Sequence, residues 1–261
     1  MEQVDIVEVV LHGTGSDISI DLHEPLMLPQ EKYEAKLALK NFSTYNNIPN
    51  VTKNVNNKLK LKVPGAENWE TVDFFTGAYE IKRLNTQLQE WIKTTHPKLK
   101  DVETNFKLVG NEATARAEFV FQDNYHISFD VEHSICKLLG WNKEDTFGGI
   151  GMHFAPHLVD IVRVTQMVFN CNIVVADYIN NARVPFIYNC GVNVPTGYKM
   201  ARELTDLTYK SITTSQVSHI RVWIVDEHGA PVNLRNDKLS VALSLKLVKR
   251  VQDVSISKGA S

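Results

Sequence analysis

Apolar and polar side chains alternate with a period of two along most of the chain. The segment DISIDL at 17–22 places Ile18, Ile20 and Leu22 on one side and polar residues on the other. The same alternation recurs in runs at 33–39, 58–63, 114–121, 126–130, 170–177, 219–226 and 238–248. Such runs, mostly bounded by Gly, Pro, Asn or Asp, are typical of half-buried strands. Many short strands separated by turns predict a β-sandwich or a β-barrel.

Helical periodicity is confined to two segments. Within 79–96, apolar residues from Ile81 to Ile92 recur at the spacing of one helix face. A shorter helix is predicted at 131–141, with Gly140 as its stop. The regular alternation of strands and helices that a parallel α/β fold requires is absent. We therefore predict an all-β, mostly antiparallel protein with short helices inserted in its connections.

The chain of 261 residues shows no internal repeat and no composition shift that marks a domain boundary. We therefore predict one domain over 17–249. Residues 1–16 are predicted to form an extended N-terminal arm, because Gly13 and Gly15 would let the segment move free of the first confident strand. Residues 250–261 lose the alternation and are predicted to be a C-terminal tail.

Composition narrows the classes of function. The formal net charge is −2, so no general basic field attracts nucleic acid. The three cysteines form no CxxC pair, and the N-terminus lacks the profile of a secretory signal, so reduced thiols in an intracellular compartment are expected. No apolar run reaches the length of a membrane span. The glycosylation sequons at Asn41 and Asn50 are therefore expected to be silent.

The three adjacent residues Asp226, Glu227 and His228 are the first candidates for chemistry. A carboxylate and an imidazole side by side suit acid–base catalysis, but that role also needs a pocket and a nucleophile or metal. Strand-like segments lie on both sides, and Gly229 can adopt the positive φ of a tight turn. We interpret the trio as the corner of a hairpin.

The other candidate motifs also lack residues that a metal, phosphate or catalytic site would need. His153 and His157 have the spacing of two metal ligands on a helical turn, but Pro156 lies between them and no third ligand follows. The glycine-rich segment at 147–151 fits no phosphate-binding pattern and is interpreted as a connecting loop. Cys136 lies in an apolar stretch and is expected to be a buried thiol.

Basic and aromatic residues provide two further candidate surfaces. Lys58, Lys60 and Lys62 form a stripe that could touch nucleic acid, although a solvated sheet face or a protected sheet edge is the simpler interpretation. The aromatic residues around the long helix are expected to pack in the core or at a subunit interface. They are Trp69, Phe74, Phe75, Tyr79 and Trp91. No motif predicts an enzyme, a cofactor or a metal site.

The order of several segments resembles the minor capsid (penton) proteins of Polinton/Maverick elements and the related adintoviruses. The segments are YNNIPN at 45–50, GAYEI at 77–81, ICKLLGW at 135–141 and DEHGAPVNLRNDKLSVALSLKL at 226–247. The resemblance spans about Asp17 to Lys249, and its segments mark a fold rather than a catalytic site. It implies a single jelly-roll β-sandwich of two four-stranded antiparallel sheets with short helices in the loops.

The resemblance also implies a function in a virion. Five copies of the chain would assemble at a capsid vertex as a homopentamer, in contact with the major capsid protein of the same element. The protein would be intracellular before assembly and would contact neither a membrane nor a specific nucleic-acid sequence. Subunit contacts are expected at loop and flank residues, namely Tyr45, Ile48, Trp69, Phe74, Tyr178, Phe186 and Tyr198.

Three alternatives remain open from the sequence. A non-viral β-sandwich module that binds carbohydrate or peptide would be monomeric. An enzyme would use Asp226 with His228, or His153 with His157. A relative of the major capsid protein is a third possibility, but that protein is a double jelly roll of about twice this length.

Overall fold

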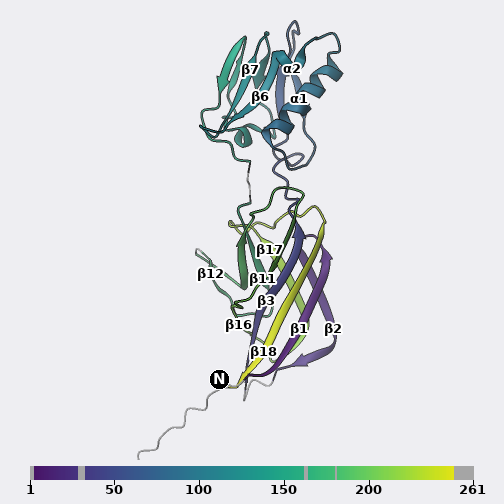
Figure 1. Cartoon of the computed structure of the whole chain (residues 1–261), viewed down its shortest axis with the longest axis vertical. Helices are drawn as coiled ribbons and strands as arrows, with labels where there is room; N and C mark the ends of the chain where they lie inside the picture. Colours follow the sequence, from purple (N-terminus) through teal and green to yellow (C-terminus); the bar gives the residue numbers. More distant parts are fainter. Residues whose placement is uncertain (1–2, 29–32, 162–163, 180, 250–261) are drawn as a thin grey trace, which may run out of the picture. The chain divides into compact units, whose positions relative to one another are not determined.

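The chain folds into two compact units, each described here by itself. The structure is a computed structural model that describes residues 3–28, 33–161, 164–179 and 181–249 (Figure 1). Unit 1 contains the residues up to Asn47 and those from Val164 onwards, and unit 2 is Ile48–Arg163. The prediction of one domain over 17–249 is therefore wrong. The inserted segment forms a separate unit because it buries its own apolar core.

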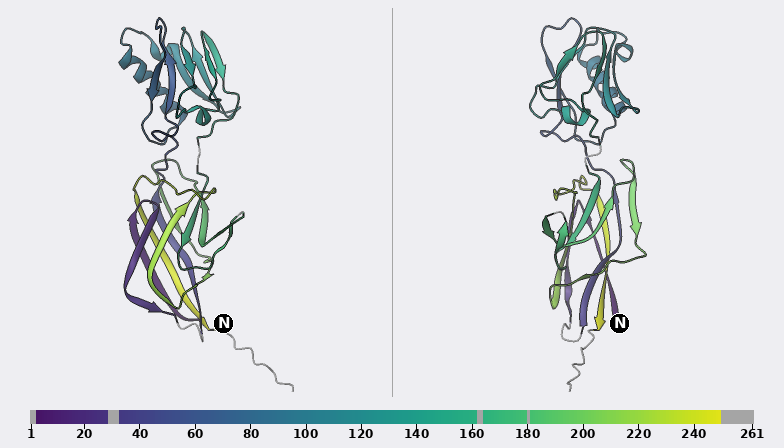
Figure 2. Two further views of the ribbon diagram at one scale, coloured as in Figure 1. Left: turned by 180° about the vertical axis from the view of Figure 1, so that it is seen from behind. Right: turned by 90° about the vertical axis from the view of Figure 1, so that its left-hand side faces the viewer.

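Unit 1 is built from two antiparallel sheets (Figures 1 and 2). The first sheet has the order β1-β18-β3-β15, and β16 also pairs with β3; the second has the order β14-β11-β17-β2. The strands are β1 (Gln3–Thr14), β2 (Asp17–Met27), β3 (Tyr33–Tyr45), β11 (Gln166–Cys171), β14 (Phe186–Gly191), β15 (Lys199–Glu203), β16 (Lys210–Ser211), β17 (Gln216–Val225) and β18 (Lys238–Lys249). A separate hairpin joins β12 (Asp177–Ile179) to β13 (Ala182–Val184).

The strand order of unit 1 is that of a jelly roll. β15 pairs with the end of β3 at Asn41–Tyr45 and β16 with Lys36 and Leu37, so these two short strands share one edge position. With that edge counted once, each sheet has four strand positions. The chain crosses between the sheets at nearly every connection, as the Greek-key connections of a jelly roll require. The predicted fold class is confirmed for unit 1.

The core of unit 1 lies between its two sheets. Phe42 on β3 and Phe169 on β11 come from opposite sheets, and their ring centroids are 4.7 Å apart. Tyr188 on β14 lies within 6.4 Å of both rings. Phe42 and Phe169 are almost fully buried, so this aromatic group joins the two layers at the centre of the sandwich.

The N-terminal segment is a strand of the sandwich. β1 pairs with β18 from Gln3 to Thr14, and its side chains Val9 and Leu11 are buried. Gly15 has a φ of +80° and turns the chain towards β2. The prediction of a free arm over 1–16 is therefore wrong, because the alternation continues through Val9 and Leu11 and the glycine forms a corner. The predicted tail over 250–261 lies outside the described residues.

Unit 2 combines two small antiparallel sheets with a helix. The sheets have the orders β5-β4-β8-β9 and β10-β7-β6. Its elements are β4 (Lys58–Lys62), β5 (Glu70–Asp73), α1 (Ile81–Thr95), α2 (Val102–Asn105), β6 (Phe106–Asn111), β7 (Arg116–Phe121), β8 (His126–Ser128), a 3-10 helix (Cys136–Leu139), β9 (Thr146–Gly148) and β10 (Gly151–Phe154). No helix in the described ranges is long and apolar enough to cross a membrane.

The two helix predictions have different outcomes. The long helix predicted over 79–96 is confirmed as α1. The helix predicted over 131–141 contracts to a single 3-10 turn at Cys136–Leu139. Gly140 ends this turn as predicted, with a φ of +77°. A Cβ at that position would lie 2.3 Å from the carbonyl oxygen of His157, so the close chain approach also requires glycine.

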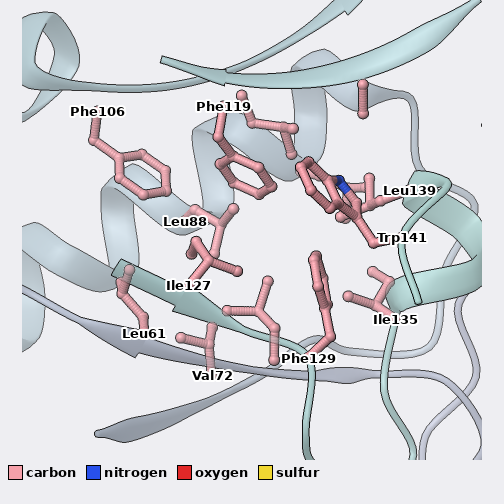
Figure 3. Close-up of a cluster of buried hydrophobic side chains, with 14 of the residues drawn as sticks. Leu61, Val72, Leu88, Phe106, Phe119, Ile127, Phe129, Ile135, Leu139 and Trp141 are labelled. Carbon is pink, nitrogen blue, oxygen red and sulfur yellow. The ribbon is translucent and has the colours of Figure 1, made fainter. Parts of the chain in front are cut away.

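Aromatic side chains fill the core of unit 2 (Figure 3). The ring of Phe119 lies within 6.4 Å of the rings of Phe106, Phe121, Trp141 and Phe147. Helix α1 closes one side of this core with Leu84, Leu88 and Ile92, which are fully buried. These contacts give the inserted unit a hydrophobic centre of its own.

Replacing Phe42 by Ala should destabilise the protein by about 3–5 kcal/mol, because it leaves a cavity where the sheets of unit 1 meet. Chemical denaturation followed by circular dichroism measures the change. Tyr178→Ala is the matched control: its side chain is exposed, so the effect should stay within about 0.5 kcal/mol. Equal effects of the two variants would contradict the proposed central role of the Phe42 contact.

Candidate functional site

The Asp226–Gly229 segment forms a closed turn. The N–H groups of His228 and Ala230 donate to Asp226 Oδ1 at 2.9 and 2.8 Å, and the N–H of Gly229 donates to the carbonyl of Asp226 at 3.1 Å. Gly229 has a φ of +84°, as the turn requires. Asp226 is therefore occupied by local backbone donors, and the interpretation of the trio as a corner is confirmed.

The turn is tight, but β17 before it and β18 after it do not pair with each other. The N–H of Val232 donates to the carbonyl of Ile224 at 3.1 Å, which closes a short local hairpin. Beyond it, β17 and β18 join opposite sheets of unit 1. The hairpin interpretation therefore holds for the turn alone, and the loop from Asp226 to Asp237 is a crossover between the two layers.

Glu227 fixes the point at which the chain re-enters unit 1. Its carboxylate accepts hydrogen bonds from the Thr165 hydroxyl at 2.7 Å, from the Thr165 N–H at 3.1 Å and from the Gln166 N–H at 3.3 Å. Burial raises the pKa of Glu227, but the hydrogen bonds from Thr165 and Gln166 outweigh it and lower the pKa overall. The acid therefore acts as an anchor in its ionised form.

A second carboxylate of the same loop holds the point at which the chain leaves unit 1. The Asn47 side-chain amide donates to Asp237, and the neighbouring Asn46 amide donates to the carbonyl of Val194 at 2.7 Å. Asn47 is the last residue of unit 1 before the insertion. The β17–β18 loop therefore holds both ends of the unit 1 chain at the insertion, one through Asp237 and one through Glu227.

A pocket of about 500 Å³ lies between this loop and the β12–β13 hairpin. Val168, Val184 and Val225 contribute apolar walls, and the Asp226–Gly229 turn contributes the polar side. The carboxylates of Asp226 and Glu227 are already committed to backbone donors, as described above. Among the residues that the structure describes, no group of three His, Cys, Asp or Glu side chains could hold a metal ion.

His153 and His157 do not form a shared site. His153 lies on β10, and its Nε2 is 3.1 Å from the carbonyl oxygen of Gly149. His157 follows the strand, and its Nε2 is 3.1 Å from Asn142 Oδ1. Because each ring has its own local partner and the segment is not helical, the spacing of four residues does not produce a ligand pair.

The cysteines are buried thiols. Cys136, Cys171 and Cys190 are all free and buried. Burial raises the pKa of the Cys171 thiol to about 11, and burial also raises the pKa of Cys190. Both thiols therefore remain protonated near neutral pH and are poor nucleophiles.

The lysine stripe lies on a half-buried face of the sheet. β4 pairs with β5 on one side and β8 on the other, so it is not an edge strand. The lysines alternate with buried Leu59 and Leu61, and Lys58 lies 3.7 Å from Asp73. The interpretation of the stripe as a protected sheet edge is therefore wrong.

The residues predicted for subunit contacts differ in accessibility. In unit 1, Tyr178 is 73% exposed, Tyr198 is 65% exposed and Tyr45 is 38% exposed. Phe186 is partly buried beneath the ammonium group of Lys210, which lies 4.5 Å from its ring centroid. These four residues belong to one unit and stay a prediction for contacts between copies.

The three predicted contact residues in unit 2 show a different pattern. Trp69 is 40% exposed and Ile48 is partly buried. Phe74 is 3% exposed and packs in the core against Tyr79, with ring centroids 6.4 Å apart. Its assignment as a surface contact is wrong, because the inward alternation of β5 continues to position 74; the neighbouring Phe75 is 80% exposed.

Comparisons with known proteins show a structural likeness at low sequence identity. Neither a protein-family model nor a curated protein matches the sequence. The crystal structure of the selenomethionine-labelled mavirus penton protein is similar with a TM-score of 0.49 and 10% sequence identity, over 94% of this chain and 100% of that chain. The jelly-roll class assigned to unit 1 rests on its own strand order.

Replacing Glu227 by Gln should destabilise unit 1 by about 1–2 kcal/mol at neutral pH, because the charged acceptor of three hydrogen bonds is lost. The folded-state pKa is lowered, so the contribution is complete above the unfolded pKa of about 4.3 and disappears as the pH falls through the folded pKa. Denaturation of both proteins across this range measures the difference. Glu24→Gln, an exposed acid on β2, is the control. A difference that does not depend on pH would contradict the ionised anchor.

Proposed function

We propose that this protein is a structural capsid protein, the penton subunit of a Polinton- or adintovirus-like virion, and that it assembles as a homopentamer at the capsid vertex. The proposal is carried by the eight-position jelly-roll order of unit 1, an architecture used by viral capsid proteins among others. Because a fold alone does not define a function, the segments that resemble penton proteins provide the second support.

Those segments form structural junctions. Asn50, from YNNIPN, donates its amide to the carbonyl of Tyr79 at 2.8 Å, and its Oδ1 accepts the Tyr79 N–H at 2.8 Å. Tyr79 belongs to GAYEI, so two of the segments are bonded directly to each other. Trp141, from ICKLLGW, lies in the core of unit 2 with its ring centroid 4.2 Å from that of Phe147. These residues stabilise the fold and provide no reactive groups, which supports a structural role for the protein.

Assembly would depend on contacts between the sides of neighbouring copies. A closed ring of five requires a heterologous contact, in which two different surfaces of the chain meet. A stable contact of this kind buries at least about 1,200 Å² in total. Exposed aromatic side chains are favourable anchors for it, and Tyr178, Tyr198 and Tyr45 provide them on unit 1. The other partner would be the major capsid protein, and the site of action would be the virion.

A binding module is the second candidate function. The observation that favours it is the pocket of about 500 Å³ beside the β12–β13 hairpin, a volume within the range of small-ligand sites. Its walls are largely apolar and would suit an apolar side chain of a peptide. Such a protein would act as a monomer.

Light scattering after size-exclusion chromatography tests the assembly. We expect a species of five times the chain mass, either from the protein alone or after addition of the major capsid protein of the same element. Replacing Tyr178 and Tyr198 together by Asp should weaken it at least tenfold, because truncated and charged anchors cost more than about 1.4 kcal/mol at an interface.

Phe75→Asp is the matched control, because it charges an exposed aromatic residue of unit 2 that is not among the predicted contacts. Two results together would favour the binding module instead. The chain would stay monomeric under both conditions, and it would bind a peptide that the Val184→Asp variant no longer binds.

A further inference from the structure

β10 is an edge strand of unit 2. The sheet order is β10-β7-β6, and β10 pairs with β7 alone among the described strands. Its register places Gly151 opposite Phe121 and Phe154 opposite Glu118. One side of the strand is therefore bonded within the sheet, while the other side is open.

The main-chain groups at positions 152 and 154 face the open side. In an antiparallel pair, alternate residues direct both main-chain groups to the partner strand. The N–H of Ala155 donates to the carbonyl of Ala117 at 2.9 Å, so by alternation His153 also bonds to β7. Met152 and Phe154 consequently direct their N–H and C=O groups away from β7, and no main-chain bond to another described residue satisfies them.

The two side chains of β10 that flank His153 are apolar and exposed. Met152 and Phe154 are each 55% exposed, and Ile150 in the preceding turn is 73% exposed. On the same face of the sheet, Val120 lies opposite Met152 and Val109 is 38% exposed. Glu118 lies between Phe154 and Val109 on this face, but it is buried and accepts a hydrogen bond from Asn111 at 2.7 Å. Natural edge strands are protected by lysine, proline, a bulge or short length. β10 has none of the first three, and its four residues leave two open positions, at Met152 and Phe154.

We propose that β10 pairs antiparallel with β10 of a second copy, about a two-fold axis at His153. In this register Met152 of one copy lies opposite Phe154 of the other, and the open main-chain groups of both residues are satisfied reciprocally. The pairing joins two three-stranded sheets of unit 2 into one continuous sheet. It also brings each Met152 thioether against a phenyl ring, which is a favourable contact.

A second copy suits this edge because the edge is complementary to itself. Met152 and Phe154 lie symmetrically about His153, so a two-fold axis matches donors to acceptors without a shift of register. β10 carries no acidic or basic side chain other than the histidine, so the approach of two copies brings no Lys, Arg, Asp or Glu of this strand together.

The expected contact is weak. The exposed parts of Ile150, Met152 and Phe154 amount to a few hundred Å² per copy, below the roughly 800 Å² per partner of a standard interface. Pairing should therefore depend on protein concentration. The inference does not rest on the proposed pentamer, but linkage of several β10 edges in a ring would strengthen it through multivalency.

Residue-resolved amide hydrogen exchange on the full chain tests the pairing. Over about two orders of magnitude in concentration, we expect the amides of Met152 and Phe154 to become about tenfold more protected while the mass from light scattering rises. The amide of His153 already bonds to β7 and should change little. This alternation distinguishes strand pairing from stacking of side chains.

Two variants and a matched control complete the experiment. Phe154→Pro removes an open N–H without removing a bond to β7, and Met152→Lys places a charge on the edge. Both should abolish the concentration-dependent protection and the part of the rise in mass that pairing through β10 contributes. Phe75→Lys, at an exposed aromatic residue outside the β10-β7-β6 sheet, should preserve both effects.

Exchange at positions 152 and 154 that is independent of concentration would overturn the inference, as would equal loss of association in Phe75→Lys. Concentration-dependent protection of the Met152 amide that persists in Phe154→Pro would overturn it as well. A ring of five copies without protection at β10 would remove this inference and leave the proposed function intact. Protection at β10 in a chain that never forms a ring of five would support this inference and contradict the proposed function.

Discussion

The constraint on which the structure depends is the closure of the jelly roll across an inserted unit. β3 and β11 belong to the same sandwich, yet the chain leaves after Asn47 and returns only at Val164. Two carboxylates of the β17–β18 loop, Asp237 and Glu227, hold these two points. Because a long insertion adds only a modest loop-closure cost when its ends are fixed, such anchors let unit 2 fold around its own core without disturbing the sandwich.

The local sequence pattern predicted the individual strands and helices better than it predicted their division into two units. The period of two found most strands, and the period of 3.6 found α1 because Leu84, Leu88 and Ile92 all face the core. The insertion was missed because both units are antiparallel β structures with the same period. The segments at its ends have no Gly-rich or Ser-rich linker that would mark a boundary.

The candidate site shows the same limit. The turn at Asp226 could be predicted because its donors are two and four residues away. The role of Glu227 could not, because its donor Thr165 is 62 residues away in the sequence and only the tertiary fold brings the two together. Phe74 is a different case: continuing the alternation from buried Val72 would have placed it in the core and Phe75 outside.

The two edge strands β2 and β10 differ in how they are protected against pairing with a further strand. In unit 1 the edge strand β2 carries Pro25 and several acids, and Asp17 is paired with Arg221 across the strand, with Nε to Oδ1 at 2.8 Å. These features discourage the addition of a further strand. β10 of unit 2 lacks them and exposes Met152 and Phe154 instead. Addition of a strand at β2 is therefore disfavoured, whereas the edge of β10 carries neither proline nor acidic side chains.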